Sequence, residues 1–226
     1  MKALILAAGR GERMRPLTDS TPKPLLVVRG KRLIEWHLEA LARAGVRKVV
    51  VNTAWLEEQV PAALGDGSRW GLSIAYSMEG RDHGGALETA GGMAKALPLL
   101  SDPFWVVSGD VFVPGFDFPA APLDAQLAHL WLVPNPPHHA AGDFGIDSAG
   151  LAVREAPCFT WSGLGLFSSH FVAKLMNGLG AGAKAPLRPY LEAAIDRRAL
   201  GATLWRGEWT DVGTPERLAA LNAGAG

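Results

Sequence analysis

The 226-residue chain has little cysteine, no excess of charge of either sign and no long apolar run. Its single cysteine, Cys158, excludes an intramolecular disulfide framework and a metal site built from cysteines alone. Lysine plus arginine equals aspartate plus glutamate at 22 each, which argues against a general nucleic-acid or membrane-surface role. Because no apolar run is long enough to cross a bilayer and no signal-like N-terminal region is present, we expect a cytoplasmic protein.

The chain also lacks two common nucleotide-binding motifs. No Gly-Lys-Ser/Thr triplet of a P-loop occurs in it. The hexapeptide GRGERM at 9–14 begins like a dinucleotide-binding fingerprint, but Met14 stands where that fingerprint needs its third glycine. Neither motif therefore explains the N-terminal glycines.

The N-terminal segment 1–26, MKALILAAGRGERMRPLTDSTPKPLL, predicts a phosphate-binding loop. An apolar strand over 2–7 leads into a glycine-rich stretch with three arginines, followed by Lys23 between two prolines. Gly9 and Gly11 allow close approach of the backbone to an anion, and the prolines limit where Lys23 can point. Backbone N–H groups and fixed positive charge in this arrangement suit a nucleoside triphosphate. A basic surface loop after a strand is the alternative interpretation.

The alternation of apolar runs and helical patterns predicts an α/β fold. Strands are predicted over 2–7, 47–52, 72–77, 104–108, 129–133 and 202–206. Helices are predicted over 32–44, 86–97 and about 186–199, with a last one from Pro215. Strand–helix–strand order of this kind indicates a Rossmann-like, doubly wound, largely parallel mixed sheet with helices on both faces. We expect one domain over 1–226, with a nucleotide-binding part over about 1–112 and a second substrate-binding part over about 113–226.

Two aspartates follow apolar runs at predicted strand ends. Ser108-Gly109-Asp110 follows the run that ends at 107, and Asp211 precedes a turn and a helix start. Ligands of doubly wound sheets sit beyond the carboxyl ends of the strands, which places Asp110 on the same edge as the phosphate loop. A carboxylate there suits a hard cation such as Mg²⁺, although a turn or helix cap could explain each aspartate alone.

The N-terminal loop resembles the signature of the sugar nucleotidyltransferases, which join a nucleoside triphosphate to a sugar 1-phosphate. The residues that carry the resemblance are LAAGRGERMRPLT at 6–18 and PKPL at 22–25. The likeness continues through LETAGG at 87–92, Gly109-Asp110, the stretch 163–167 and WTDVGTP at 209–215. It implies a GT-A-like fold whose second part binds the sugar. It also implies a short, single-domain member without a C-terminal left-handed β-helix.

The resemblance implies a role for each matching residue. Arg13 would grip the triphosphate, and Lys23 would bridge its α-phosphate and the incoming sugar phosphate. Asp110 and Asp211 would hold Mg²⁺. The other implied nucleotide contacts come from the first loop and from the segment that reads the base: Ala7, Ala8, Gly9, Gly11, Glu88 and Thr89.

The sugar side departs from the family pattern at one place. Gly163 lies where a main-chain contact to the sugar is expected. Many relatives carry Glu-Lys-Pro with a lysine that holds the sugar phosphate, and the best match here is REAP at 154–157, where an alanine replaces that lysine. Arg154 is therefore a candidate for the sugar-phosphate contact, with Arg197 and Arg206 as the other possibilities.

The resemblance implies transfer of a uridylyl group from UTP to N-acetylmuramic acid α-1-phosphate, giving a UDP-sugar and pyrophosphate. This reaction belongs to peptidoglycan sugar recycling for the cell wall. The alternatives are a guanylyl- or thymidylyltransferase for another hexose or heptose 1-phosphate, and a non-enzymatic sugar-nucleotide sensor. We expect no nucleic-acid or membrane partner, and no heptad pattern indicates an oligomeric surface.

Overall fold

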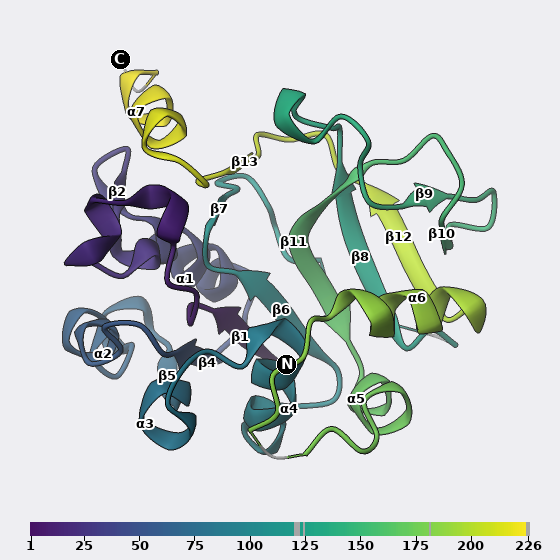
Figure 1. Cartoon of the computed structure of the whole chain (residues 1–226), viewed down its shortest axis with the longest axis horizontal. Coiled ribbons are helices and arrows are strands. Elements are labelled where there is room, and N and C mark those ends of the chain that lie inside the picture. The colour runs from purple at the N-terminus through teal and green to yellow at the C-terminus, as the bar shows by residue number, and fades with distance from the viewer. Residues whose placement is uncertain (120–122, 124, 181, 225–226) are drawn as a thin grey trace.

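The computed structural model describes residues 1–119, 123, 125–180 and 182–224. Its central feature is a seven-stranded sheet (Figure 1). In spatial order the strands are β12 (Leu200–Leu204), β8 (Ala128–Val133), β11 (Thr160–Phe167), β6 (Phe104–Ser108), β1 (Lys2–Leu6), β4 (Lys48–Thr53) and β5 (Ser73–Met78). All neighbours pair in parallel except β11, which runs antiparallel to both β6 and β8. The prediction of a doubly wound, largely parallel mixed sheet is confirmed.

Five of the six predicted strands lie within one residue of their expected bounds, because each is an apolar run with β-branched or aromatic residues that fits a buried strand. The strand expected over 202–206 begins two residues earlier. Leu200 is fully buried and pairs with Ala128 of β8, so the edge of the sheet starts soon after the preceding helix.

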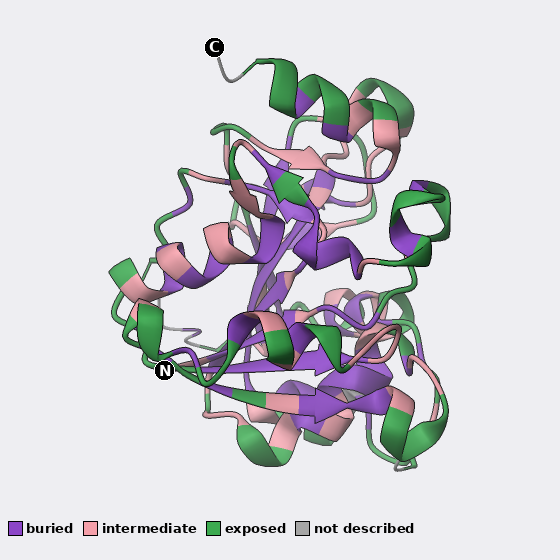
Figure 2. Cartoon of the chain, turned by 90° about the vertical axis from the view of Figure 1, so that its left-hand side faces the viewer, coloured by how far each residue is buried: buried purple, intermediate pink, exposed green. Residues whose placement is uncertain are grey.

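Helices cover the two faces of the sheet. Alternating side chains of β1 divide between them: Ala3 and Ile5 pack with α1 (Leu33–Arg43) and α2 (Gln59–Leu64), whereas Leu4 packs with the helices of the other face. Those helices are α4 (Glu88–Ala96), α5 (Ser169–Leu175) and α6 (Arg188–Asp196). Figure 2 shows the strands buried between helices whose outer sides are exposed.

A third apolar cluster brings the C-terminal helix back to the N-terminal segment. Helix α7 (Pro215–Ala223) packs through Leu218 and Leu221 against Met14 and Val28, beside the hairpin of β2 (Val27–Val28) and β3 (Lys31–Arg32). The short strands β7 (Val111–Phe112) and β13 (Thr210–Asp211) pair antiparallel just before it. This pairing places Asp211 opposite Val111, next to Asp110.

The remaining elements are α3 (Glu79–His83) and the antiparallel pair β9 (Gly145–Ile146) and β10 (Ala152–Val153). Short 3-10 turns cover 12–14, 17–19 and 23–25 in the N-terminal segment. Among the helices of the described residues, none is both long and apolar enough to span a membrane. The division into a nucleotide-binding part and a sugar-binding part stays a prediction.

Candidate active site

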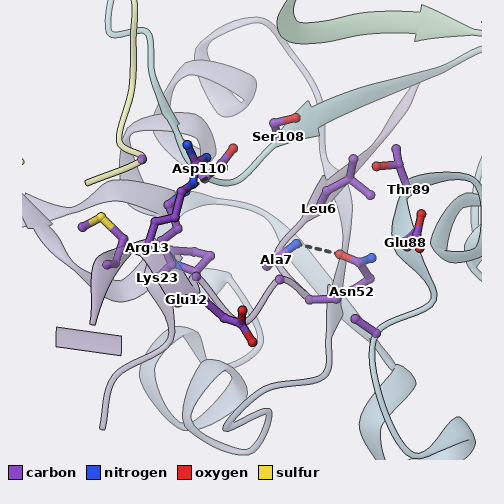
Figure 3. Close-up of a pocket in the computed structure, with 17 residues that line it drawn as sticks. Leu6, Ala7, Glu12, Arg13, Lys23, Asn52, Glu88, Thr89, Ser108 and Asp110 are labelled. Carbon is purple, nitrogen blue, oxygen red and sulfur yellow. Dashed lines mark hydrogen bonds and ion pairs between the residues drawn. The ribbon is translucent and has the colours of Figure 1, made fainter. Parts of the chain in front are cut away.

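A cavity of about 570 Å³ lies beyond the carboxyl end of β1. Strand β1 sits between β4 and β6, where the strand order reverses, which is the usual ligand position in sheets of this type. The residues predicted to be catalytic or nucleotide-binding all line this one cavity: Ala7, Ala8, Gly9, Gly11, Arg13, Lys23, Glu88 and Thr89. Figure 3 shows Arg13, Lys23 and Asp110 on one side of it and Glu88 and Thr89 on the opposite side.

The loop after β1 folds back onto Lys23. Gly11 has φ +67°, and a Cβ built on it would lie 3.1 Å from Thr18 Cγ2 and 3.3 Å from Lys23 Cβ. The Thr18 hydroxyl donates to the Gly11 carbonyl at 2.8 Å, and Met14 N–H donates to the same carbonyl. Glycine therefore suits position 11, because a side chain there would be strained by the left-handed conformation and would press on Thr18 and Lys23.

A second cavity, of about 340 Å³, adjoins the first. Gly163 and Asp211 line it together with Trp161 and Trp209. The residues that line both cavities are Arg13, Ser108 and Asp110. The two cavities therefore meet at one arginine, one hydroxyl and one carboxylate.

The three arginines of the N-terminal loop have different surroundings. The Arg10 guanidinium lies 4.4 Å from the centroid of the Trp55 ring, and Arg15 pairs with Asp19 at 2.8 Å. Arg13 is exposed and lines both cavities. Of the three, Arg13 is thus the guanidinium placed where the two cavities meet.

Asp110 and Asp211 lie next to each other through the β7–β13 pair. Asp211 is in register with Val111, and Val212 N–H donates to the Asp110 carbonyl at 2.9 Å. Each carboxylate is held by a cation. Lys23 Nζ lies 2.7 Å from Asp110 Oδ2, and Arg217 Nη1 donates to both oxygens of Asp211.

The donor set at this junction fits a divalent cation completed by substrate. Within the ranges that the structure describes, no three histidine, cysteine, aspartate or glutamate side chains are grouped to hold a metal ion. Asp110 and Asp211 nevertheless both line the second cavity, and one or two carboxylates suffice for a divalent ion whose other ligands are water and substrate. A cation bound there would replace the ion pairs that Lys23 and Arg217 now make.

The structure brings Gly163 to the second cavity but leaves Arg154 away from it. Gly163 has φ +82°, and a Cβ there would lie 2.7 Å from both Cβ and Oγ of Ser108, so β11 approaches the end of β6 only because this residue is glycine. Arg154 lies outside both cavities, where its guanidinium donates to Asp196 Oδ1 at 2.8 Å. Neither Arg197 nor Arg206 is among the lining residues.

Sequence reasoning did not identify several lining residues. Those absent from the prediction include Glu12, Met14, Asn52, Ser108, His138, His139, Thr160, Trp161 and Trp209. Ser108 could have been inferred, because it lies between the predicted strand end and Asp110. The histidines and tryptophans could not, because nothing in their spacing selects them until β8, β11 and β13 are placed together.

Comparison with known proteins identifies the class of this fold and site. A sequence model described as nucleotidyl transferase matches residues 2–145. The chain is 49% identical over 236 residues to the N-acetylmuramate alpha-1-phosphate uridylyltransferase of Neisseria meningitidis, covering 100% of this chain and 99% of that protein. The chain therefore belongs to the nucleotidyl transferase family, as the N-terminal signature predicts.

Two further relatives widen the comparison. A glucose-1-phosphate thymidylyltransferase of Streptomyces griseus is 30% identical over 98% of this chain, which spans 65% of that protein's length. A crystal structure described as a putative glucose-1-phosphate thymidylyltransferase of Bacillus anthracis, in complex with a sucrose, superposes with a TM-score of 0.83. It covers 100% of this chain and 95% of that chain at 23% identity, which supports the fold. Members of the family generally use divalent metal ions.

Proposed function

We propose that this chain transfers a uridylyl group from UTP to N-acetylmuramic acid α-1-phosphate, releasing pyrophosphate. The observation that carries the proposal is the meeting of two cavities at Arg13, Ser108 and Asp110. The choice of substrates rests on the 49% identity, along the whole chain, to the Neisseria meningitidis uridylyltransferase. The proposed reaction belongs to the recycling of peptidoglycan sugars, and a cytoplasmic location stays a prediction.

The first cavity would hold the nucleotide. Its residues come from about 1–112 apart from Gly213, and they divide into a charged side and the Glu88–Thr89 side. UTP would place its phosphates against Arg13 and Lys23 and its base against Glu88 and Thr89. The main chain of Ala7, Ala8, Gly9 and Gly11 would support the nucleoside and phosphates between them.

The second cavity would hold the sugar 1-phosphate. Most of its lining comes from residues after 112, which supports the proposal of a sugar-binding part over about 113–226. Trp161 and Trp209 offer flat apolar faces to a sugar ring, and Gly163 offers main-chain groups. We leave Arg154 out of this contact set, because its guanidinium is paired with Asp196 and lies outside the cavity.

The chemistry is a direct displacement at the α-phosphorus of UTP. A phosphate oxygen of the sugar 1-phosphate forms the new bond, the bond to the oxygen that bridges to the β-phosphate breaks, and pyrophosphate leaves with that electron pair. The attacking phosphate is already ionised near neutral pH, so no general base is needed. The protein contributes positioning and fixed positive charge from Arg13 and Lys23.

We propose Mg²⁺ as the divalent ion, held by Asp110 and Asp211. When bound, it would supply positive charge that offsets the negative charge developing on the reacting phosphates. The Lys23 ammonium is paired with Asp110 at 2.7 Å. If Asp110 bound the divalent ion instead, this ammonium would be released to contact the α-phosphate.

A thymidylyltransferase for glucose 1-phosphate is the second candidate. Its support is the 30% identity to the Streptomyces griseus enzyme over 98% of this chain. The same residues would carry the same displacement, and only the contacts to base and sugar would differ. A sugar-nucleotide sensor would need neither the paired aspartates nor the junction of two cavities.

Pyrophosphate release tests the proposal. The protein is incubated with Mg²⁺ and each of UTP, dTTP, GTP and ATP, together with N-acetylmuramic acid α-1-phosphate, N-acetylglucosamine 1-phosphate or glucose 1-phosphate. We expect release to be fastest with UTP and N-acetylmuramic acid α-1-phosphate. Faster release with dTTP and glucose 1-phosphate would favour the second candidate. Binding without release for every pair would favour the sensor.

A further inference from the structure

The most deeply buried carboxylate beside the nucleotide cavity has no role in the displacement. Glu79 begins α3 and is 0% exposed, and its neighbour Asn52, at the end of β4, is 2% exposed. Burial raises the pKa of Glu79, and hydrogen bonds from Leu87 N–H and Asn52 oppose that rise. A buried charge of this kind is costly unless its hydrogen-bonding groups are satisfied.

Three hydrogen bonds connect Glu79 and Asn52 to the two sides of the cavity. Ala7 N–H donates to Asn52 Oδ1 at 2.6 Å, as Figure 3 marks. The Asn52 amide then donates to Glu79 Oε1 at 2.7 Å, and Leu87 N–H donates to Glu79 Oε2 at 2.8 Å. The Asn52 oxygen and amide and both Glu79 oxygens each take part in one of these hydrogen bonds. The partner of each atom therefore determines whether that atom must be a donor or an acceptor.

The two ends of this series of bonds are the two sides of the nucleotide site. Ala7 opens the phosphate loop, defined here as residues 7–11. Leu87 directly precedes Glu88 in the base loop, the name used here for residues 85–89, which include the first two residues of α4. Both loops line the cavity.

The base loop is held in a strained conformation. Glu88 has φ +60°, which a non-glycine residue rarely adopts. Leu87, just before it, is fixed on both sides: its N–H donates to Glu79, and its carbonyl accepts from Ala185 N–H at 3.0 Å. Glu79 is thus one of two anchors for the residue that precedes Glu88.

Packing around the Asn52–Glu79 pair is tight. A Cβ built on Gly92 of α4 would lie 2.7 Å from Asn52 Nδ2 and 2.7 Å from Glu79 Oε1. The backbone of α4 therefore packs closely against the pair on this side. In such a buried site an unpaired donor costs more than a surface hydrogen bond gains.

We propose that Glu79 and Asn52 are positioning residues that fix the phosphate loop relative to the base loop and thereby set nucleotide affinity and base selectivity. The inference rests on the proposed function in placing a nucleotide in this cavity. Neither side chain is assigned to the reacting atoms. Their effect passes through Ala7 on one side and Leu87 on the other.

The test is a swap of the carboxylate and the amide. In Glu79→Gln the new NH₂ group faces another donor, either Leu87 N–H or the Asn52 amide, so one hydrogen bond is lost. In Asn52→Asp a second carboxylate faces Glu79, and the hydrogen bond between the two side chains is lost. The double variant restores every bond. Its new carboxylate at position 52 accepts from Ala7 N–H and from the new amide at position 79, whose oxygen accepts from Leu87 N–H. The double variant also keeps the total charge and nearly the shape of the wild-type pair.

Two measurements report the outcome. Amide hydrogen exchange is followed in the unliganded protein at peptides covering 4–11 and 84–90, and nucleotide dissociation constants are measured for UTP and dTTP without sugar phosphate. We expect each single variant to exchange faster in both peptides and to lose about tenfold in UTP affinity, the equivalent of one net hydrogen bond. We also expect the dissociation constants of each single variant for UTP and dTTP to lie closer together than those of the wild type. The double variant should return to within about threefold of wild type.

Glu57→Gln is the matched control. Glu57 Oε2 also accepts a backbone N–H of α3, from Gly80 at 3.1 Å, but a glutamine there keeps an acceptor for this single donor. It should leave exchange and affinity unchanged. The proposal would be overturned by single variants with wild-type exchange and selectivity, or by a double variant no better than the singles. A wild-type protein that bound no nucleotide would contradict the proposed function alone, since exchange in the unliganded protein still decides the network.

Discussion

Individual cations at this site are distinguished by their partners. Arg10 faces the Trp55 ring, Arg15 pairs with Asp19, and Lys23 pairs with Asp110. For Arg13, the ion pairs of the described residues include no carboxylate partner. An exposed guanidinium that borders both cavities is available to two phosphate groups at once, which is what a displacement between them requires.

Arg13→Ala should lose about 10²–10³ in kcat, by analogy with loss of a preorganised oxyanion donor. The side chain is exposed, so the variant should keep the wild-type unfolding midpoint. Steady-state pyrophosphate release and thermal unfolding measure the two effects. Arg15→Ala is the control, because its partner Asp19 lies outside both cavities, and equal losses in the two variants would remove Arg13 from its assigned role.

His37 should make stability depend on pH. Complete burial in α1 lowers its pKa from 6.5 to about 4. Between pH 6.5 and 4 the imidazole of His37 is therefore protonated in the unfolded chain but neutral in the folded protein. The free energy of unfolding should fall by about 3 kcal/mol as the pH drops through this range. Urea unfolding of the wild type and of His37→Gln measures this. The variant should show a shallower loss over the same interval, and an identical slope would show that His37 does not contribute.

At the scale of elements, the parallel strands and the signature loop were predictable because their information is local. The run ALIL of β1 is apolar, β4 contains three consecutive valines, and the GRGER loop contains the glycines that its conformation needs. The partners of those elements were not predictable. Asn52 contacts Ala7 only because β1 and β4 pair in parallel register, and His138 meets Asp211 only after β7 and β13 pair.

The missing lysine shows the same limit. The segment at 154–157 was the best local match to the family's lysine motif, yet the structure places Arg154 against Asp196 and away from both cavities. The position of a cation relative to a cavity depends on β9, β10 and α6 together. Spacing along the chain does not contain that information.

Gly163→Ala should test how closely β11 approaches the end of β6. The alanine must adopt φ +82° and place a methyl group 2.7 Å from Ser108, in the wall shared by the two cavities. We expect a loss of more than about 1–2 kcal/mol in the free energy of unfolding, the usual cost of the left-handed conformation alone. The KM for the sugar phosphate should rise more than the KM for UTP.

Gly150→Ala is the matched control for this substitution. Gly150 has a similar φ of +76°, but a Cβ there meets nothing within 4 Å. It should show the conformational cost without the collision and without a change in either KM. Equal unfolding free energies for the two variants would contradict a close contact between Gly163 and Ser108.

At the scale of the whole molecule, the chain closes on itself to complete the site. Helix α7 packs against Met14 and Val28, and this contact carries Asp211 from near the C-terminus to Asp110. Asp110 and Asp211 are far apart in sequence, and the 2.9 Å hydrogen bond from Val212 N–H to the main-chain carbonyl of Asp110 holds their two strands together. The site is therefore formed only in the complete fold.

Asp211→Asn should raise the concentration of divalent ion needed for half-maximal activity and lower kcat. An amide keeps the shape of the side chain but removes the negative charge that attracts the divalent ion and pairs with Arg217. Metal titrations of pyrophosphate release, together with direct binding of Mn²⁺ followed by its magnetic resonance signal, measure the change. The exposed Asp117→Asn is the control, and an unchanged Mn²⁺ affinity in Asp211→Asn would contradict the assignment of this carboxylate.

In the proposed reaction both substrates occupy adjoining cavities and react directly. Exchange of labelled pyrophosphate into UTP, measured with and without N-acetylmuramic acid α-1-phosphate, tests it most directly. Direct displacement predicts exchange only when the sugar phosphate is present, because no uridylylated protein forms. Exchange in its absence would show a covalent intermediate and would contradict the joint role of the two cavities.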